Sequence, residues 1–318
     1  MDTKISSFFS KNSFISIEGA TPKDIKELFD QADTIRKLPF KKTSVLLQGK
    51  LVTLLFFEPS SRTFSSFVAA VKKLGGMTIE YQNPTQTSSS VKGETLEDTM
   101  RVFATYSDAV IMRHFQKGTL KRASDAVTIP VINAGDGIGE HPTQALLDAY
   151  TIHRKKKKLN GLTGLITGDL LNGRTVHSLL KLLALYKHNT LYLLAPKELK
   201  LEVSLRKEME KKGLTLVEIT SQNDIPPHCD FWYWTRVQKE RFANKQEYEK
   251  LKHTFVLTPQ LLKEKGDTNT IIMHPLPRVG EIDPALDTDP RALYLTEEIQ
   301  NGLYIRMALL NVILGKKV

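Results

Sequence analysis

Apolar and polar residues follow two different periods along most of the chain. From position 50 onward, short apolar runs typical of buried strands precede stretches in which apolar residues recur every three or four positions, as on one helix face. The clearest case is the apolar run 51–57, which ends in Glu-Pro-Ser-Ser and is followed by apolar residues at 64, 67, 68, 71 and 74. This pattern predicts a strand, a tight turn and a helix that ends at Gly75-Gly76.

The same alternation continues to the end of the chain. In the first half it predicts further strands at 77–81, 109–112 and 130–133, and helices at 62–74, 95–106, 119–126 and 142–153. In the second half it predicts strands at 162–167, 190–194, 215–219, 230–234 and 271–273, and helices at 174–186, 203–212 and 291–314. Strands that alternate with helices form parallel sheets with helices on both faces. We therefore expect an α/β fold of two doubly wound parallel-sheet domains joined by helices, with the C-terminal helix returning to the first domain.

Length and composition agree with this fold class. The 318 residues suffice for two domains, and 41% hydrophobic and 25% charged residues are typical of a soluble globular protein. We expect a first domain at 1–140, completed by the C-terminal helix 291–318, and a second domain at 141–290.

The sequence also suggests where the protein works. No apolar run approaches the roughly 20 residues of a membrane span, and the first ten residues lack the apolar core of a signal peptide. The single cysteine, Cys229, excludes an internal disulfide and a zinc site built from several cysteines of this chain. We expect a cytoplasmic protein with no membrane partner, no metal ion and no cofactor.

The net charge of +10 has two interpretations, a nucleic-acid surface or an anionic small substrate. The densest basic run, 154–158, follows the helix predicted from Pro142, and cations are favoured at a helix C-terminus. No aromatic residues interleave the run, as a surface for single strands would require. We therefore expect no nucleic-acid partner, and a basic nucleic-acid-binding protein is the non-enzymatic alternative.

Polar residues at the predicted strand ends carry the candidate chemistry. Ser60, Ser61, Arg62 and Thr63 stand at the predicted start of the helix after the first strand. Unpaired N–H groups, the helix dipole, hydroxyls and a guanidinium together make an anion site, although Ser60 or Ser61 could serve only as an N-cap. Ligands of open α/β sheets bind beyond the carboxyl ends of strands. Other polar clusters follow predicted strands there: Arg113-His114, His141–Gln144, Thr167–Asp169 with Arg174, Thr235–Gln238 and His274–Pro277.

These clusters together resemble the aspartate carbamoyltransferases. The first half carries Phe-Phe-Glu-Pro-Ser-Ser-Arg-Thr at 56–63, Met-Arg-His at 112–114, Asn-Ala-Gly-Asp-Gly at 133–137 and His-Pro-Thr-Gln-Ala-Leu-Leu-Asp at 141–148. The second half carries Gly-Arg-Thr-Val-His-Ser at 173–178, Thr-Arg-Val-Gln-Lys-Glu-Arg at 235–241 and His-Pro-Leu-Pro-Arg at 274–278. Each motif alone is weak, but the full set in the family's order is specific. The resemblance implies the synthesis of N-carbamoyl-L-aspartate and phosphate from carbamoyl phosphate and L-aspartate, the committed step of pyrimidine synthesis.

The resemblance assigns a role to each matching residue. Ser60–Thr63 and Arg113 are implied to hold the phosphate, and Thr63, Arg113 and His141 to surround the carbonyl oxygen. Gln144 and the main chain of Pro275, Leu276 and Pro277 are implied to bind the carbamoyl group. Arg174 is implied to bind the α-carboxylate of aspartate, and Arg236, assisted by Gln238, its side-chain carboxylate.

The resemblance further implies a homotrimer with shared active sites. In the family, residues matching Ser88 and Lys92 reach into the site of a neighbouring subunit. The catalytic and binding set then comprises Arg62, Thr63, Lys92, Arg113, His141 and Gln144, with Ser88 at the carbamoyl phosphate and Lys92 also at the aspartate. Regulatory chains or a dihydroorotase partner stay open.

The chain departs from the family's pattern at four positions. Ser61 replaces a frequent threonine, Phe64 an arginine, Glu140 an amide and Gly280 an acid. The last three put substrate affinity and domain-closure contacts in doubt. The nearest alternative is an ornithine carbamoyltransferase or another amino-acid carbamoyltransferase. Ornithine enzymes have a cysteine where Pro275 stands, and Arg236 would repel the ammonium group of ornithine.

Overall fold

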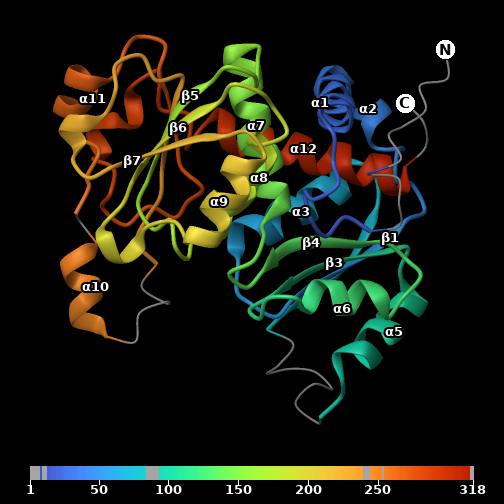
Figure 1. The fold of residues 1–318 in the computed structure, drawn as a ribbon. Helices are drawn as coiled ribbons and strands as arrows, with labels where there is room; N and C mark the ends of the chain where they lie inside the picture. The colour runs from blue at the N-terminus through green and yellow to red at the C-terminus, as the bar shows by residue number, and fades with distance from the viewer. Residues whose placement is uncertain (1–7, 9–12, 84–92, 239–243, 253, 316–318) are drawn as a thin grey trace. The chain divides into compact units, whose positions relative to one another are not determined.

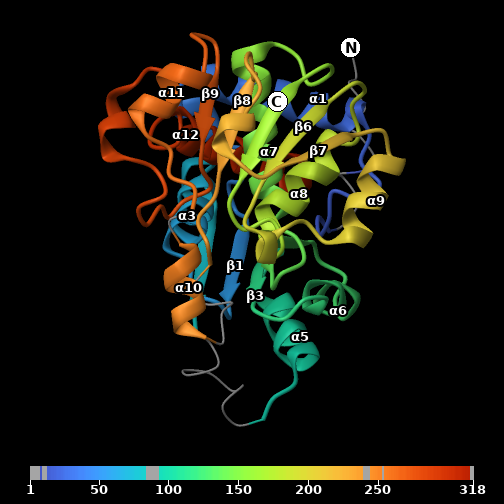
Figure 2. The same cartoon turned by 60° about the vertical axis from the view of Figure 1, so that its left-hand side comes forward.

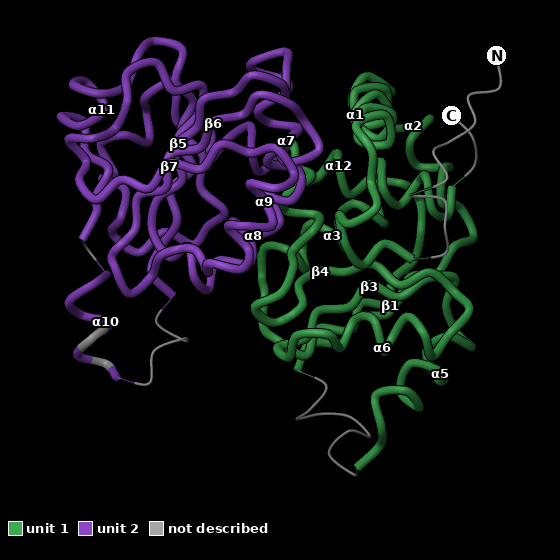
Figure 3. The backbone as a smooth tube through the Cα atoms, in the orientation of Figure 1, with its two compact units in different colours: residues 1–146, 301–318 green, residues 147–300 purple. Residues whose placement is uncertain are grey.

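The computed structural model describes residues 8, 13–83, 93–238, 244–252 and 254–315. The chain forms two compact units, one of residues 1–146 with 301–318 and the other of residues 147–300 (Figure 3). Two helices, α7 (Pro142–Lys156) and α12 (Glu297–Leu314), carry the chain from one unit into the other. The predicted fold class is confirmed, because each unit is built on a parallel sheet and the C-terminal helix returns to unit 1.

The sheet of unit 1 has four parallel strands in the order β2-β1-β3-β4. They are β1 (Leu51–Phe56), β2 (Met77–Gln82), β3 (Ala109–His114) and β4 (Val131–Asp136). Successive side chains of a strand face opposite sides of a sheet. Leu55 and Met112 accordingly join the core cluster that contains Leu120 of α6 (Thr119–Asp125) and Met100 of α5 (Leu96–Tyr106). Helices α5 and α6 lie on the sheet face opposite α3 (Ser61–Lys73) (Figures 1 and 2).

Two helices near the N-terminus, α1 (Pro22–Lys37) and α2 (Phe40–Thr43), were not expected from the apolar pattern. The start of α1 carries a clear local signal, because Thr21 and Asp24 form a capping box and Pro22 occupies the first turn. Residues before α1 extend the sheet, since Phe14 forms a parallel bridge with Ile132 of β4.

The sheet of unit 2 has five parallel strands in the order β7-β6-β5-β8-β9. They are β5 (Thr163–Thr167), β6 (Thr190–Leu194), β7 (Thr215–Ile219), β8 (Phe231–Trp234) and β9 (Ile271–Met273). Four α-helices lie between α7 and α12 among the described residues of unit 2: α8 (Arg174–Leu183), α9 (Val203–Lys211), α10 (Lys245–Leu251) and α11 (Pro259–Lys265). Short 3-10 helices occupy Lys197–Leu199, Gln222–Asp224 and Pro284–Thr288. Trp232 and Trp234 pack on the face that contains Leu262 of α11, while Tyr233 faces α7.

The predicted start of the C-terminal helix at Arg291 is wrong. The helix begins at Glu297, because the preceding residues run beside β9. Ile272 donates its N–H to the carbonyl of Arg291 at 2.8 Å, and Leu293 donates to the carbonyl of Ile272 at 2.9 Å. The sheet therefore takes the main-chain groups that a helix would need.

Among the described residues, no helix combines the length and apolar character needed to cross a bilayer.

The strand orders place one topological switch point in each unit. In unit 1 the chain goes from β1 to β2 on one side and then to β3 on the other, and in unit 2 the same reversal separates β5 from β8. Ligands of open α/β sheets bind at the carboxyl ends of strands at such points.

Candidate active site

The switch point of unit 1 joins the first two predicted anion-binding elements. Phe56, the last residue of β1, is in register with Arg113 of β3. The turn that follows β1 and the guanidinium-bearing end of β3 therefore meet at the same edge of the sheet. Ser60–Thr63 and Arg113 lie at this edge, as the sequence predicts.

The first turn of α3 presents main-chain donors and hydroxyls together. Ser60 is the N-cap residue of α3, with extended φ and ψ, but its side chain makes no capping hydrogen bond. Ser61 and Arg62 are exposed and Thr63 is buried. Because the first N–H groups of a helix lack helical partners and carry partial positive charge, this turn is suited to an anion.

Arg113 is a buried cation held by its surroundings. Its Nε lies 3.0 Å from Oε2 of Glu58, and its Nη1 donates to the carbonyl oxygen of Ala134 at 3.3 Å. A Cβ added to Gly135 would lie 3.0 Å from Nη1, so glycine allows the guanidinium to approach the main chain. Glu58 belongs to the motif at 56–63 but has no predicted role, and the structure makes it the ionic partner of Arg113.

His141 stands directly before α7 and meets α3. Its Nε2 lies 3.4 Å from Oγ1 of Thr63, and both side chains are buried. Gln144, one turn along α7, donates its main-chain N–H to the carbonyl oxygen of His141 at 3.0 Å. The structure therefore brings together Thr63 and His141, two of the three residues assigned to the carbonyl oxygen.

The unusual residues of this unit have structural partners. The ring of Phe64 is buried and packs edge-on against Phe56 at a centroid distance of 5.1 Å. The carboxylate of Glu140 accepts hydrogen bonds from the hydroxyl of Ser16 at 2.8 Å and the N–H of Ile17 at 3.2 Å. Phe64 thus belongs to the core, and Glu140 ties down the N-terminal segment.

The switch point of unit 2 holds the predicted aspartate-binding residues. Thr167 at the end of β5 is in register with Trp234 at the end of β8. Gly168 has φ of +115°, and a Cβ there would lie only 2.1 Å from the carbonyl oxygen of Thr235, so the two loops approach as only glycine permits. Arg174 begins α8 and Arg236 follows β8, and both side chains are partly exposed.

Asp169 connects these two loops through hydrogen bonds, a role that the sequence did not predict. Its Oδ1 accepts the N–H of Asn172 at 2.9 Å, and it also accepts a main-chain hydrogen bond from Gln238. Asp169 is fully buried, and this burial raises the pKa of its carboxyl group. The signal in the sequence was an acidic residue directly after a glycine at a predicted strand end.

The loop after β9 offers acceptors to a ligand. The N–H of His274 donates to Oε2 of Glu298 at 3.0 Å, and the N–H of Leu276 donates to Nδ1 of His274 at 2.8 Å. Pro275 and Pro277 have no N–H. The stretch 274–277 can therefore bind a ligand through main-chain carbonyl oxygens but not through main-chain donors.

Ser88 and Lys92, two of the candidate residues, are outside the described residues. Cys229 is buried in the core of unit 2, where burial raises the pKa of its thiol to about 11, so it is a poor nucleophile. Gly280 is exposed, beside the buried Glu281. Among the described residues, no group of three or more His, Cys, Asp or Glu side chains is arranged to hold a metal ion.

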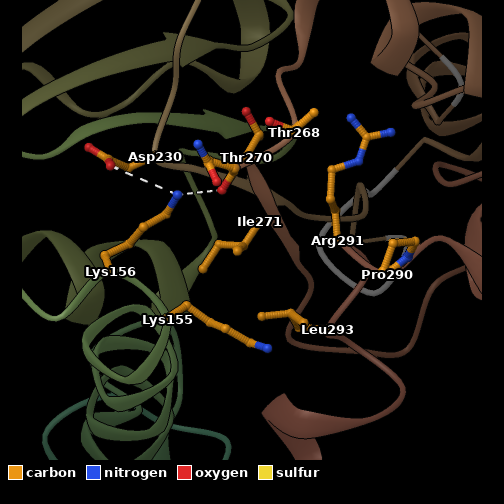
Figure 4. A pocket seen from close by; sticks show the side chains of 10 residues that line it. Lys155, Lys156, Asp230, Thr268, Thr270, Ile271, Pro290, Arg291 and Leu293 are labelled. Carbon is orange, nitrogen blue, oxygen red and sulfur yellow. Dashed lines mark hydrogen bonds and ion pairs between the residues drawn. The ribbon is translucent and has the colours of Figure 1, made fainter.

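A separate polar hollow of about 440 Å³ lies between the end of α7 and the segment before β9 (Figure 4). It contains none of the candidate residues. Its two lysines have protein partners, since Lys155 bonds with Glu297, and Lys156 bonds with the carbonyl of Asn269 and lies 3.9 Å from Asp230. Part of the basic run 154–158 is therefore neutralised within unit 2.

Comparison with known families covers nearly the whole chain. The family model "Aspartate/ornithine carbamoyltransferase, carbamoyl-P binding domain" matches residues 12–154, and the model "Aspartate/ornithine carbamoyltransferase, Asp/Orn binding domain" matches residues 160–313.

Among curated relatives, the aspartate carbamoyltransferase catalytic subunit of Methanocella arvoryzae is 43% identical over 96% of this chain and 98% of its own length. The multifunctional protein pyr1-3 of Dictyostelium discoideum is 45% identical over 95% of this chain. The chain spans only 13% of that multifunctional protein.

Solved structures agree with these matches. The catalytic subunit of M. jannaschii aspartate transcarbamoylase is 40% identical, with a TM-score of 0.86 over 94% of this chain and 97% of that chain. The Trypanosoma cruzi aspartate transcarbamoylase in complex with carbamoyl phosphate and aspartate is 37% identical, with a TM-score of 0.88 over 98% of both chains. Because the two family models span both sheets, and the M. arvoryzae and M. jannaschii catalytic subunits match nearly end to end, the chain belongs to the aspartate/ornithine carbamoyltransferase family.

Proposed function

We propose that this chain is an aspartate carbamoyltransferase, which transfers the carbamoyl group of carbamoyl phosphate to the amine of L-aspartate and releases N-carbamoyl-L-aspartate and phosphate. Relatives that carry this name and match the chain nearly end to end support the proposal. A related enzyme of T. cruzi has been solved with carbamoyl phosphate and aspartate. In the cell, this reaction would supply de novo pyrimidine synthesis.

In this proposal, unit 1 is the carbamoyl-phosphate domain, for which the sequence predicts residues 1–140 with 291–318, and unit 2 is the aspartate domain, for which it predicts residues 141–290. The phosphate binds at the first turn of α3, where Ser60, Ser61, Arg62 and Thr63 supply hydroxyls, main-chain N–H groups and a guanidinium. Arg113 supplies a second fork-shaped cation whose position is fixed by Glu58. Binding the phosphate at a helix N-terminus also stabilises the charge that it gains when it leaves.

The reaction needs stabilisation of an oxyanion and no covalent nucleophile. The lone pair of the aspartate amine attacks the carbonyl carbon, the new N–C bond forms and charge develops on the carbonyl oxygen. Thr63, Arg113 and His141 donate to that oxygen, and loss of one donor of this kind raises a barrier by about 2.7–4 kcal/mol. The C–O bond to phosphate then breaks, the electron pair leaves with the phosphate oxygen, and the attacking nitrogen gives its proton to the departing phosphate.

The carbamoyl NH2 group requires acceptors. Gln144 and the main-chain carbonyls of the 274–277 loop, with Pro275, Leu276 and Pro277, take this role. The loop is suited to it, because its N–H groups at His274 and Leu276 are already bonded within the protein. Acceptors fixed in this way hold the carbamoyl plane in one orientation for attack.

The observation that carries the choice of aspartate is the pair of arginines at the switch point of unit 2. Arg174 and Arg236 follow the two neighbouring strands β5 and β8, so two cations are available for two carboxylates. The nearby acid, Asp169, is fully buried and bonded to main-chain N–H groups, so it is not offered to the ammonium of ornithine. Gln238 assists Arg236 in this proposal.

We also propose a cytoplasmic homotrimer in which Ser88 and Lys92 complete the site of a neighbouring subunit. Support comes from the resemblance of the sequence around these residues to the family. A dihydroorotase or another pyrimidine enzyme is one class of proposed partner, and it is supported by two relatives that are multifunctional proteins far longer than this chain. Regulatory chains are a second class of partner for the trimer.

The direct test is an assay of the purified protein with carbamoyl phosphate and either aspartate or ornithine. We expect carbamoyl transfer to aspartate and none to ornithine. Transfer to ornithine alone would replace the proposal by an ornithine carbamoyltransferase. Absence of transfer to either amino acid, in a protein that unfolds cooperatively, would refute the proposed activity.

A further inference from the structure

Two buried carboxyl groups lie behind the 274–277 loop in unit 2. Asp148 belongs to α7 and Glu298 to the first turn of α12, and they are 0% and 2% exposed. Taking two charged carboxylates into a protein interior at one place is strongly unfavourable. The pair therefore needs either neutralisation or donors on every oxygen.

The hydrogen bonds around the pair leave one oxygen without a donor. The hydroxyl of Tyr233 donates to Oδ2 of Asp148 at 2.8 Å, and the N–H of His274 donates to Oε2 of Glu298 at 3.0 Å. The other oxygen of Glu298, Oε1, is buried and accepts no hydrogen bond from the described residues, and its carboxyl group interacts with that of Asp148. Two carboxyl groups can bond to each other only if one of them carries a proton.

We propose that Glu298 is a positioning residue of the enzyme: its neutral carboxyl group donates a proton to Asp148 and accepts the N–H of His274, and so holds the 274–277 loop in place. The inference rests on the proposed function in one respect, namely that the carbonyls of this loop receive the carbamoyl NH2 group. The pair then carries a single negative charge, which the hydroxyl of Tyr233 stabilises.

Further hydrogen bonds connect His274 to the rest of the loop. Its Nδ1 accepts the N–H of Leu276, so Nε2 carries the proton and donates to Oε1 of Glu281 at 2.6 Å. The second oxygen of Glu281 accepts the N–H of Val279 at 2.8 Å. Glu298 thus fixes the first residue of the loop, and the His274 ring and Glu281 fix the residues after it.

The same network reaches the other loop of the aspartate domain. The hydroxyl of Tyr233 also forms a hydrogen bond with the side chain of Thr175, the residue that follows Arg174 in α8. One chain of hydrogen bonds therefore joins the helix start that carries Arg174 to the loop after β9. Side-chain networks of this kind rigidify a site when every member is satisfied.

The local electrostatics favour the neutral acid. The titratable groups that face Glu298 are Asp148, Tyr233 and His274, through its main chain. Burial, followed by the charge of Asp148, raises the pKa of Glu298 well above its ordinary value of 4.5. The folded protein therefore holds this proton to a higher pH than the unfolded chain does, as with other carboxylic acids kept neutral in apolar sites.

The first test does not depend on activity. Glu298→Gln keeps a donor for Asp148 and an acceptor for His274, whereas Glu298→Ala keeps neither, and Glu297→Gln is the matched control at the neighbouring residue that bonds with Lys155. Hydrogen exchange at the amides of His274 and Leu276 should be at least tenfold faster in Glu298→Ala and unchanged in the two glutamine variants. Equal exchange in all four proteins would overturn the proposal.

Thermal unfolding against pH tests the shared proton. Above pH 4.5 the unfolded Glu298 loses its proton while the folded one keeps it, so the residue's contribution to stability falls as pH rises. Glu298→Gln has no such loss, and its Tm should exceed that of the wild type by a margin that grows from pH 5 to pH 8. A difference in Tm that stays constant from pH 5 to pH 8, whatever its sign, would show that folding does not retain a proton on Glu298.

Kinetics test the consequence for the reaction. We expect Glu298→Ala to lose at least tenfold in kcat while the Kd for inorganic phosphate, measured by calorimetry, stays within twofold of the wild type. Glu298→Gln should restore kcat. If Glu298→Gln fails like Glu298→Ala, the positioning role is wrong. A wild type without carbamoyl transfer would refute the proposed function instead, and exchange and unfolding would still test the hold on the loop.

Discussion

In the proposed function, Arg62 binds carbamoyl phosphate and Arg236 binds aspartate. Arg62 is exposed in the first turn of α3, where it adds charge to main-chain donors. Arg236 is partly exposed after β8, close in sequence to Gln238, whose main chain is held by Asp169. The kinetics of their variants should therefore differ in kind.

Arg62→Ala should raise the KM for carbamoyl phosphate and lower kcat by at least a hundredfold, because one charge-assisted contact to the phosphate is lost in the transition state. Arg101→Ala is a matched control on a surface helix, where Arg101 pairs with Asp98. Steady-state assays at varied carbamoyl phosphate measure both. Wild-type turnover in Arg62→Ala would refute the role of the α3 turn.

Arg236→Ala should raise the KM for aspartate far more than the KM for carbamoyl phosphate. Its guanidinium faces only the second substrate in the proposed function, and the loss of one charged partner costs about 2–5 kcal/mol. The assay varies each substrate in turn with the other saturating. Equal increases in the two KM values would count against the assignment.

The titration of His274 should make the stability of the protein depend on pH. Burial lowers the pKa of His274 from its ordinary value of 6.5, with Glu281 opposing the shift. The folded protein therefore holds the neutral ring, whose Nδ1 accepts the N–H of Leu276. As the pH falls below 6.5 the unfolded chain takes up a proton first, so stability declines until the pH passes the lower pKa of the folded state.

His274→Asn, which keeps an acceptor near Nδ1 but does not titrate, provides the comparison. Its Tm should be lower than that of the wild type at pH 8, because the bond to Glu281 is lost, and the difference should shrink as the pH falls from 6.5 to 5. Parallel curves for the two proteins would mean that folding does not lower the pKa of His274.

At the scale of elements, the approach of the β5 and β8 loops depends on Gly168. A Cβ at Gly168 would lie 2.1 Å from the carbonyl oxygen of Thr235, whereas a Cβ at Gly213 would have nothing within 4 Å. Both glycines have positive φ, at +115° and +103°, so Ala at either position carries a similar backbone cost of about 1–3 kcal/mol.

Gly168→Ala should therefore lose more stability than Gly213→Ala, and only Gly168→Ala should raise the KM for aspartate, since only that loop leads to Arg174. Denaturant unfolding and steady-state kinetics of the two variants measure the difference. An unchanged KM for aspartate in a folded Gly168→Ala protein would contradict the described junction of the loops.

Most strands and helices of the two sheets could be predicted, because each strand is a short apolar run and each helix repeats its apolar face. Helices α10 and α11 were missed, because each has only seven residues and is too short to show a helical period of apolar positions. The start of α12 was misplaced because nothing local reveals that residues 291–293 pair with β9. A main-chain contact between distant segments leaves no periodic signal.

The sequence was sufficient to place the candidate residues at strand ends, but it did not reveal the residues that hold them in position. Glu58, Asp169 and Glu298 act through contacts with side chains or main chain brought near by folding. Asp169 and Glu298 are buried acids, which hydrophobic patterning does not anticipate. Resemblance to a family supplied the roles of the arginines, and it assigned nothing to these three acids.

At the scale of the whole molecule, the proposed trimer predicts complementation. Lys92→Ala and Arg113→Ala should each be inactive, but a mixture that exchanges subunits should recover part of the activity, because some sites then receive intact residues from two chains. The control is a mixture of Arg113→Ala with Arg101→Ala, a variant that keeps all the proposed site residues. No recovery after verified exchange would argue against a shared site.

The central claim is that one chain binds the carbamoyl donor at the α3 turn and the acceptor at the arginines of the second sheet. A crystal structure with N-(phosphonacetyl)-L-aspartic acid, which has been solved with the T. cruzi relative, tests it most directly. We predict that the phosphonate contacts residues 60–63 and Arg113 and that the two carboxylates contact Arg174 and Arg236. A phosphonate bound away from residues 60–63 would contradict the account.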